Sequence, residues 1–132
     1  MIRSWVYGKM TGSVTLMALV GSRIYESSEL QEVPIKPYLM YKMFVTAPEM
    51  MGDDLSKVLT QGFQVFVHDV PGDFLRIDDI IQVLRNLFTN ASDKAAGVVS
   101  VRWVDVSEDF RDSDMGTNTK FIRFRVLYKE VT

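Results

Sequence analysis

Hydrophobic positions along this chain recur with two periods, one typical of helices and the other typical of strands. Near the N-terminus a stripe at helical spacing consists of Ile2, Trp5, Val6, Met10, Val14, Met17 and Ala18. Gly8 and Gly12 interrupt this stripe, which predicts two short helices or one broken helix. We expect Thr11 or Ser13 to cap the second piece and Gly21 to end it.

The next hydrophobic segments are extended rather than helical. A short extended run at residues 23–26 and a turn fixed by Pro34 and Pro37 precede a strand at residues 38–45. This strand is apolar on both faces except for Lys42, which favours burial on both sides or partial burial by another subunit.

The central part of the chain predicts a strand followed by an amphipathic helix. One apolar face is formed by Phe63, Val65 and Val67, and the strand ends at residues 70–72. Asp73 is placed to cap the helix that follows. The apolar stripe of this helix comprises Ile77, Ile80, Ile81, Leu84, Leu87 and Phe88. Its opposite side is polar, so we expect the helix to lie over a sheet.

Two alternating segments, residues 99–103 and 121–131, predict strands near the end of the chain. In the second segment Ile122, Phe124, Val126 and Tyr128 face one way, and Arg123, Arg125 and Lys129 face the other. We expect the two strands to pair antiparallel through a polar loop at residues 108–118. The element order predicts a single α+β domain over residues 1–132, with a mostly antiparallel sheet, short N-terminal helices and one central helix packed on one face.

Composition excludes several classes of protein. The 132 residues include no cysteine, so disulfides and thiolate metal sites are absent. No apolar run approaches the ~20 residues that span a bilayer, and we expect no membrane association. The net charge of −2 provides no general attraction for nucleic acid. A hydrophobic content of 47% with eight methionines fits either ordinary core filling or surface that other subunits cover.

The sequence offers no set of residues for catalysis. No glycine-rich phosphate loop is present, and the only histidine, His68, has no second histidine or cysteine with which to bind zinc. We expect His68 to be exposed to solvent or satisfied within the core. The sequence therefore predicts no enzymatic activity and no cofactor.

One polar segment superficially resembles a calcium loop. Asp109, Asp112, Asp114 and Gly116 are suitably spaced in part, but Arg123 stands where the closing glutamate would be. We therefore predict no metal site. Weak binding of a divalent ion by this segment, or by the acidic residues of the segment at 46–57, stays open.

Two long polar segments, residues 46–57 and 108–118, are candidates for contact with partners because they exceed the usual length of a connection. The candidate partner-binding residues are Glu49, Met50, Met51, Asp53, Asp54, Asp109, Arg111, Asp112, Asp114 and Met115. The candidate subunit-interface residues are Tyr38, Met40, Lys42, Arg123, Arg125 and Lys129. We expect the basic residues of the last strand, with Arg102, to meet carboxylates of the same sheet or of a neighbouring subunit rather than nucleic acid. Our reason is that the aromatic residues of that strand point to the opposite face.

Two short motifs, Gly21-Ser22-Arg23-Ile24-Tyr25 and Pro37-Tyr38, resemble the tail terminator or tail completion proteins of long-tailed bacteriophages. The similarity covers most of the chain, from the N-terminal helices to the last strand. It implies an α+β protein that assembles as a hexameric ring on the head-proximal end of the tail tube. Such a ring ends tube polymerisation and presents a joining surface for head completion proteins.

The resemblance also implies a place and a set of partners. The protein is expected in the virion, at the tail neck, after assembly in the host bacterial cytoplasm. Its partners would be further copies of itself, the tube protein and the head completion or connector proteins, while DNA passes through the lumen without specific binding. Two alternatives stay open: another neck or head-to-tail joining component, and a small dimeric α+β ligand-binding or enzymatic domain with an enclosed pocket.

Overall fold

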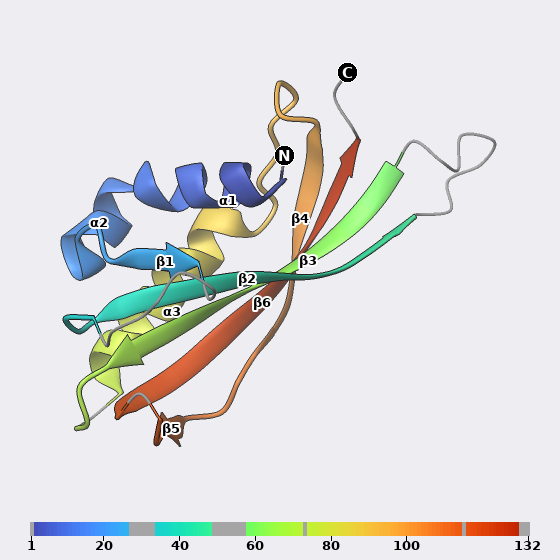
Figure 1. Ribbon diagram of the computed structural model, residues 1–132. Coiled ribbons are helices and arrows are strands. Elements are labelled where there is room, and N and C mark those ends of the chain that lie inside the picture. The colour runs from blue at the N-terminus through green and yellow to red at the C-terminus, as the bar shows by residue number, and fades with distance from the viewer. Residues whose placement is uncertain (1, 27–33, 49–57, 73, 115, 130–132) are drawn as a thin grey trace.

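The computed structural model describes residues 2–26, 34–48, 58–72, 74–114 and 116–129, and these fold as three helices and a six-stranded sheet (Figure 1). In chain order the elements are α1 (Ile2–Thr11), α2 (Val14–Val20), β1 (Ile24–Glu26), β2 (Tyr38–Pro48), β3 (Val58–Asp69), α3 (Leu75–Phe88), β4 (Val98–Val106), β5 (Phe110–Asp112) and β6 (Thr117–Lys129). This architecture confirms the predicted α+β class.

The sheet has the strand order β1-β2-β3-β6-β4, and β5 pairs with the first residues of β6. All pairs are antiparallel except β1 and β2, which are parallel. The long central pair, β3 with β6, runs in register from Val58 opposite Lys129 to Asp69 opposite Asn118. The three helices pack against one face of this sheet (Figure 1).

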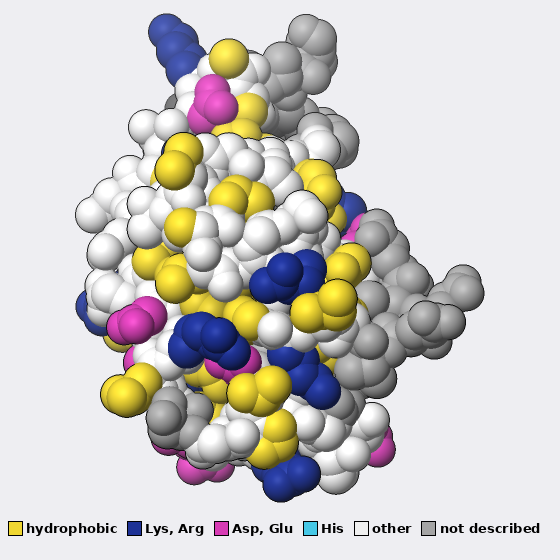
Figure 2. Space-filling model, turned by 90° about the vertical axis from the view of Figure 1, so that its left-hand side faces the viewer, with side chains coloured by type: hydrophobic (Ala, Val, Ile, Leu, Met, Phe, Trp, Pro, Cys, Tyr) yellow, Lys and Arg dark blue, Asp and Glu magenta, His cyan; other side chains and the backbone are white. Residues whose placement is uncertain are grey.

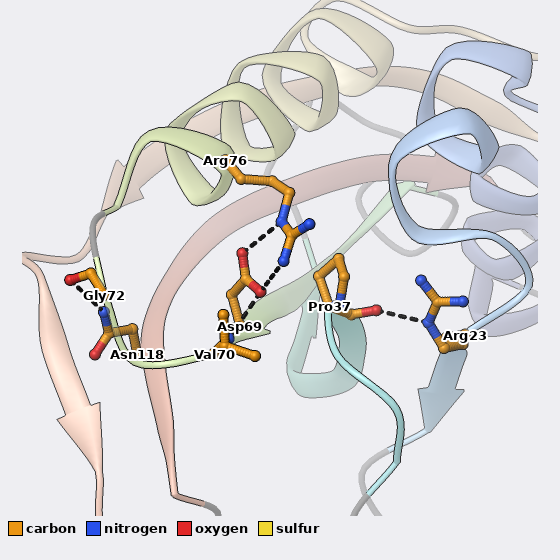
Figure 3. Close-up of polar contacts among 7 residues, drawn as sticks. All are labelled: Arg23, Pro37, Asp69, Val70, Gly72, Arg76 and Asn118. Carbon is orange, nitrogen blue, oxygen red and sulfur yellow. Dashed lines mark hydrogen bonds and ion pairs between the residues drawn. The ribbon is translucent and has the colours of Figure 1, made fainter.

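The N-terminal helices break and end where the sequence predicts. Ser13 is the N-cap of α2, and its hydroxyl accepts a hydrogen bond from the Leu16 N–H at 3.2 Å. Gly21 ends α2 with a φ of +61°, a left-handed value that glycine tolerates, and its N–H donates to the Met17 carbonyl at 2.8 Å. Arg23 then donates from Nε to the Pro37 carbonyl at 2.8 Å, which ties β1 to the start of β2 (Figure 3).

An aromatic cluster lies at the centre of the core between α3 and the sheet. The Phe63 ring lies 4.9 Å from the ring of Phe88 and 5.1 Å from that of Phe124, and the latter two rings are 5.2 Å apart. All three side chains are fully buried. The predicted stripe of α3 is buried as well, except for Leu87, which is partly exposed.

Two sequence predictions of element boundaries need correction. Residues 46–48 continue β2, and residues 117–120 belong to β6, so the strands extend into both segments that were predicted as loops. After the bulge near Val45 the ladder with β3 resumes, and Gln61 Nε2 donates to the Phe44 carbonyl at 2.7 Å. The first residues of β6 have the polar composition of a loop, but their backbone is a strand. Their polar side chains are buried and hydrogen-bonded.

The start of α3 also differs from the prediction. Phe74 is the N-cap residue, and its side chain makes no capping hydrogen bond. Asp73, the predicted cap, lies outside the described residues.

Replacing Gly62 with alanine is expected to lower the free energy of unfolding by about 1–3 kcal/mol, because the new methyl group would overpack the sheet. A Cβ at this position would lie 2.2 Å from Cε2 of Phe44, whose ring lies over the glycine. Chemical denaturation measures the effect. Gly8→Ala in α1 is the matched control, since no atom lies within 4 Å of its Cβ and helix propensity favours alanine. Equal stability of the two variants would contradict the packing account.

Candidate functional site

The face of the sheet away from the helices forms the candidate site, and we call it the open face. Leu39, Phe63 and Ile122 point into the core, so their neighbours along each strand point to the other side. The open face comprises Tyr38, Met40, Lys42 and Phe44 of β2, Gln64, Phe66 and His68 of β3, Thr119, Phe121, Arg123 and Arg125 of β6, and Arg102 and Asp105 of β4.

A pair of partly exposed aromatic rings with flanking cations occupies the middle of the open face. The Phe66 and Phe121 rings are 5.4 Å apart. Lys42 Nζ lies 5.5 Å from the centre of the Phe66 ring, and Arg123 Cζ lies 5.4 Å from that of Phe121. This combination suits contact with a surface that carries both apolar and acidic groups.

The position of Phe121 corrects one expectation. Phe124 and Tyr128 do point away from the basic residues of β6, into the core. Phe121, in contrast, shares the open face with Arg123, so the aromatic and basic residues of the strand are only partly separated.

Arg123 is paired within the sheet, as the sequence predicts. Its Nε donates to Oδ1 of Asp105 on β4 at 2.7 Å, and a second bond joins its Nη2 to Oδ2. The hydrogen bond from Arg123 holds the pKa of Asp105 below its usual value. This pair therefore contributes little free charge to the open face.

Arg125 and Arg102, by contrast, lie opposite each other in register on β6 and β4. Both side chains are exposed. They line a shallow hollow of about 70 Å³ together with Thr60, Ser100 and Leu127. A space of this size admits a carboxylate-sized group, whereas small-molecule sites usually have about 300–1,000 Å³.

At the other end of the open face, His68 and Tyr38 form a buried stack. Their rings lie 4.8 Å apart and nearly parallel, and each side chain is almost fully buried. His68 Nδ1 is 2.9 Å from the Thr117 hydroxyl and 3.1 Å from the Thr119 hydroxyl. His68 is thus buried and hydrogen-bonded rather than exposed to solvent, although it lies on the open face and outside the core between the helices and the sheet.

Burial also shifts the ionisation of this stack. It lowers the pKa of His68 from 6.5 to about 4, and the nearby Asp112 carboxylate opposes that shift. It raises the pKa of Tyr38 to about 12, with a further contribution from Asp112. Both side chains are therefore neutral at pH 7.

The six candidate interface residues all lie on the same side of the sheet. Met40, Lys42, Arg123, Arg125 and Lys129 reach its surface, while Tyr38 is buried. The candidate residues near β5 lie at the opposite end of β6 from Arg125: Asp109, Arg111, Asp112 and Asp114. Glu49, Met50, Met51, Asp53, Asp54 and Met115 lie outside the described residues.

Asp109 has partners in its own chain. Lys120 Nζ lies 3.1 Å from Asp109 Oδ1 and 2.8 Å from Asp78 Oδ1 on α3. These hydrogen bonds, chiefly the one to Asp78, raise the pKa of Lys120. Asp109 therefore serves the fold by linking the segment before β5 to β6.

Sequence reasoning missed the contribution of Phe66 and Phe121 to this face. It placed Arg102 beside the basic residues of β6 but did not predict the register that sets it opposite Arg125. Both phenylalanine positions follow from strand alternation once β6 is known to lie between β3 and β4. The alternation and the antiparallel pairing of β4 with β6 were predicted from the sequence, but the place of β6 beside β3 was not.

An ion pair between the buried Asp69 carboxylate and the partly exposed Arg76 fixes the end of β3 to the start of α3 (Figure 3). Both Asp69 oxygens accept hydrogen bonds from Arg76, at 2.7 and 2.5 Å, and Oδ1 also accepts from the Val70 N–H at 2.7 Å. Asn118 Nδ2 donates to the Gly72 carbonyl at 3.2 Å and so ties β6 to the same turn.

Replacing Arg76 with alanine is expected to lower the free energy of unfolding by about 1–2 kcal/mol, because it leaves the buried Asp69 carboxylate without its cation. The partial exposure of Arg76 moderates the loss. Chemical denaturation provides the measurement. Arg3→Ala is the control, since its ion pair with Glu26 is more exposed and should contribute less than about 0.5 kcal/mol. An equal or larger loss in the control would refute the special role of Asp69.

Apolar side chains are also exposed at the end of the molecule where α2, the start of β2 and the end of β3 lie. They are Val14, Ile35, Val70 and Leu75. Figure 2 shows this side, with hydrophobic side chains scattered between lysines and arginines rather than gathered in one large patch. Such dispersed groups are normal for a protein surface.

Two further observations concern the described ranges alone. No group of three or more histidine, aspartate or glutamate side chains is arranged there to hold a metal ion. No helix in those ranges has the length and apolar character needed to cross a membrane.

Comparison with known proteins gives matches in structure only. No family model and no curated protein matches the chain. A chain from the virion of a native gene transfer agent particle superposes with a TM-score of 0.75 at 15% identity, covering 95% of this chain and 92% of that one. The gp17 protein of bacteriophage SPP1 superposes with a TM-score of 0.57 at 15% identity, covering 99% and 91%. At this identity the matches establish a shared fold.

Proposed function

We propose that this chain is a structural protein of a phage-like particle and acts at the tail neck. In this proposal several copies form a ring, as a hexamer, on the head-proximal end of the tail tube. The ring stops tube polymerisation and offers a joining surface to head completion proteins. It has no enzymatic role and binds no cofactor.

The main support for this proposal is the fold that the chain shares with a chain of a gene transfer agent virion. The match spans more than nine-tenths of both chains, so it concerns the whole domain rather than one motif. The fold of SPP1 gp17, a phage protein, matches over a similar share. Two such neighbours make a particle component the best-supported class for this chain.

The open face provides a surface that suits a ring. A ring of identical subunits uses heterologous contacts, in which one patch meets a different patch on the next copy. The open face carries partly exposed Phe66 and Phe121 beside Lys42 and the arginines of β6. The open face as defined carries four cationic side chains and one carboxylate, so pairing it with the same face of another copy would bring like charges together, which favours contact with a different surface.

Tube assembly in the presence of this chain tests the proposal. The tube protein of the same particle is polymerised with and without the purified chain, and tube lengths are measured by negative-stain microscopy. We expect shorter tubes that carry a ring at one end. Tubes of unchanged length with bare ends would contradict termination. A ring that binds only the connector would point to another joining component of the neck.

A further inference from the structure

Two arginines that repel each other lie side by side on the open face. Arg102 and Arg125 lie directly opposite each other on β4 and β6, and both are exposed. Like charges in this position destabilise an antiparallel pair. The hydroxyl-bearing side chains of Thr60 and Ser100 line the same hollow. The arrangement therefore has positive charge and hydrogen-bonding groups around a space that fits an anionic group.

Two other cations of β6, Arg123 and Lys120, differ because each has a carboxylate partner. Arg123 is paired with Asp105, and Lys120 with Asp78 and Asp109. Within residues 2–26, 34–48, 58–72, 74–114 and 116–129, no carboxylate forms an ion pair with Arg102 or Arg125. The positive charge of β6 that no described carboxylate neutralises therefore lies at the end of the strand that holds Arg125.

The opposite end of β6 carries an excess of negative charge. Residues 108–116 contain four carboxylates and only one basic side chain, Arg111. Glu108 and Asp114 are exposed, and Asp112 lies opposite Thr117, the first residue of β6. Thr117 and Arg125 are eight positions apart on one strand, or about 27 Å. The two charged ends are therefore too far apart to meet within one chain.

We propose that Arg102 and Arg125 of one copy bind the carboxylates of Asp112 and Asp114 on the next copy. This inference rests on the proposed function, because it identifies the contact that joins the copies of the ring. Guanidinium groups form strong, charge-assisted hydrogen bonds with carboxylates. In a ring this contact is head-to-tail, because the cationic end of one copy meets the acidic end of the next, and it repeats from copy to copy until the ring closes.

A charge-exchange experiment tests this contact. One variant carries Arg102→Glu and Arg125→Glu, and the other carries Asp112→Lys and Asp114→Lys. Association of each variant is measured by light scattering over a range of concentrations. We expect each variant alone to associate at least about tenfold more weakly than the wild type. An equal mixture should assemble again, because an alternating ring of even number restores opposite charges at every contact.

Three further variants separate loss of assembly from loss of folding. Asp112→Lys removes the hydrogen bond that Asp112 Oδ1 accepts from the Asp114 N–H, so Asp114→Lys alone is included. Arg102→Gln removes the repulsion with Arg125, and we expect it to stabilise the monomer while it weakens assembly. Lys94→Glu, an exposed charge reversal outside the open face, should leave assembly unchanged.

Four outcomes would overturn the proposed contact. Wild-type assembly by both charge-reversed variants would show that the copies meet elsewhere, with the ring itself intact. Loss of thermal stability without loss of assembly would mean that the arginines contact carboxylates of their own chain. If the variant with Arg102→Glu and Arg125→Glu lost affinity for double-stranded DNA but assembled normally, the two arginines would bind DNA phosphates instead of carboxylates. A wild-type chain that never exceeds a dimer would refute the ring and the contact together.

Discussion

Replacing Leu84 with aspartate is expected to abolish folding. Leu84 lies in the middle of α3, is fully buried, and belongs to the core between the helix and the sheet. An aspartate there would either bury an unpaired charge or remain protonated at a large cost. The change also removes an apolar side chain, and Leu→Ala substitutions in cores alone cost about 2–5 kcal/mol. Together these losses are comparable to the whole stability of a small domain.

Circular dichroism and a thermal melt measure the outcome. Leu75→Asp is the matched control, because Leu75 is on the same helix but is 71% exposed. It also lies in the first turn, where a negative charge interacts favourably with the helix dipole. We expect a cooperative melt for Leu75→Asp and none for Leu84→Asp. A folded Leu84→Asp protein with near-normal stability would overturn the assignment of α3 to the core.

Acid is expected to destabilise the domain through His68. The pKa of this side chain is about 4 in the folded protein, against 6.5 when it is unfolded, because burial disfavours the charged ring. Between these values the unfolded chain binds more protons, so stability falls as the pH is lowered from 6.5 to 4. The loss amounts to at most about 3 kcal/mol. Above pH 6.5 this contribution to stability is fully present.

Denaturant unfolding at pH 7.5, 5.5 and 4 measures the effect, with His68→Gln for comparison. The glutamine amide can hydrogen-bond to the hydroxyls of Thr117 and Thr119 but does not titrate. Carboxylates contribute the same acid dependence to both proteins, so the difference between them isolates His68. We expect the wild type to lose its advantage over the variant as the pH falls. A difference that stays constant with pH would show that His68 protonates freely in the folded state.

Periodicity in the sequence was enough to predict most of the fold. The helical spacing of α3 and the alternation of Phe63, Val65 and Val67 in β3 and of residues 122–128 in β6 determine which side chains enter the core. Gly21 and Ser13 also take their predicted roles at the ends of α2. These features depend on local geometry, so they can be recognised without knowledge of the tertiary structure.

Features that depend on tertiary contacts could not be predicted in this way. Residues 117–119, Thr-Asn-Thr, resemble a loop in composition, yet they form the buried start of β6. Their polar side chains are hydrogen-bonded there: the two threonine hydroxyls bond to His68 and to each other, and Asn118 bonds to the Gly72 carbonyl. The three-residue strand β5 exists only because β6 offers it an edge. Local preference is outweighed at such positions by pairing with distant residues.

The candidate site likewise combines features that the local sequence pattern predicts with features that depend on tertiary contacts. Alternation placed Arg123 and Arg125 on one side of their strand, and the structure confirms that arrangement. The opposition of Arg125 to Arg102, and the contact of Phe121 with Phe66, required the strand order and register as well. Interface patches join residues from several strands, so a linear sequence records them only in part.

The mass of the purified protein in solution, with negative-stain images of the same sample, most directly tests the central claim that this chain forms a ring. The chain has a mass of 15.1 kDa, so six copies amount to about 91 kDa. We predict an assembly of this mass that appears as a ring with a central hole, free or at the ends of tail tubes. A stable dimer of about 30 kDa that never associates with tubes would contradict the account.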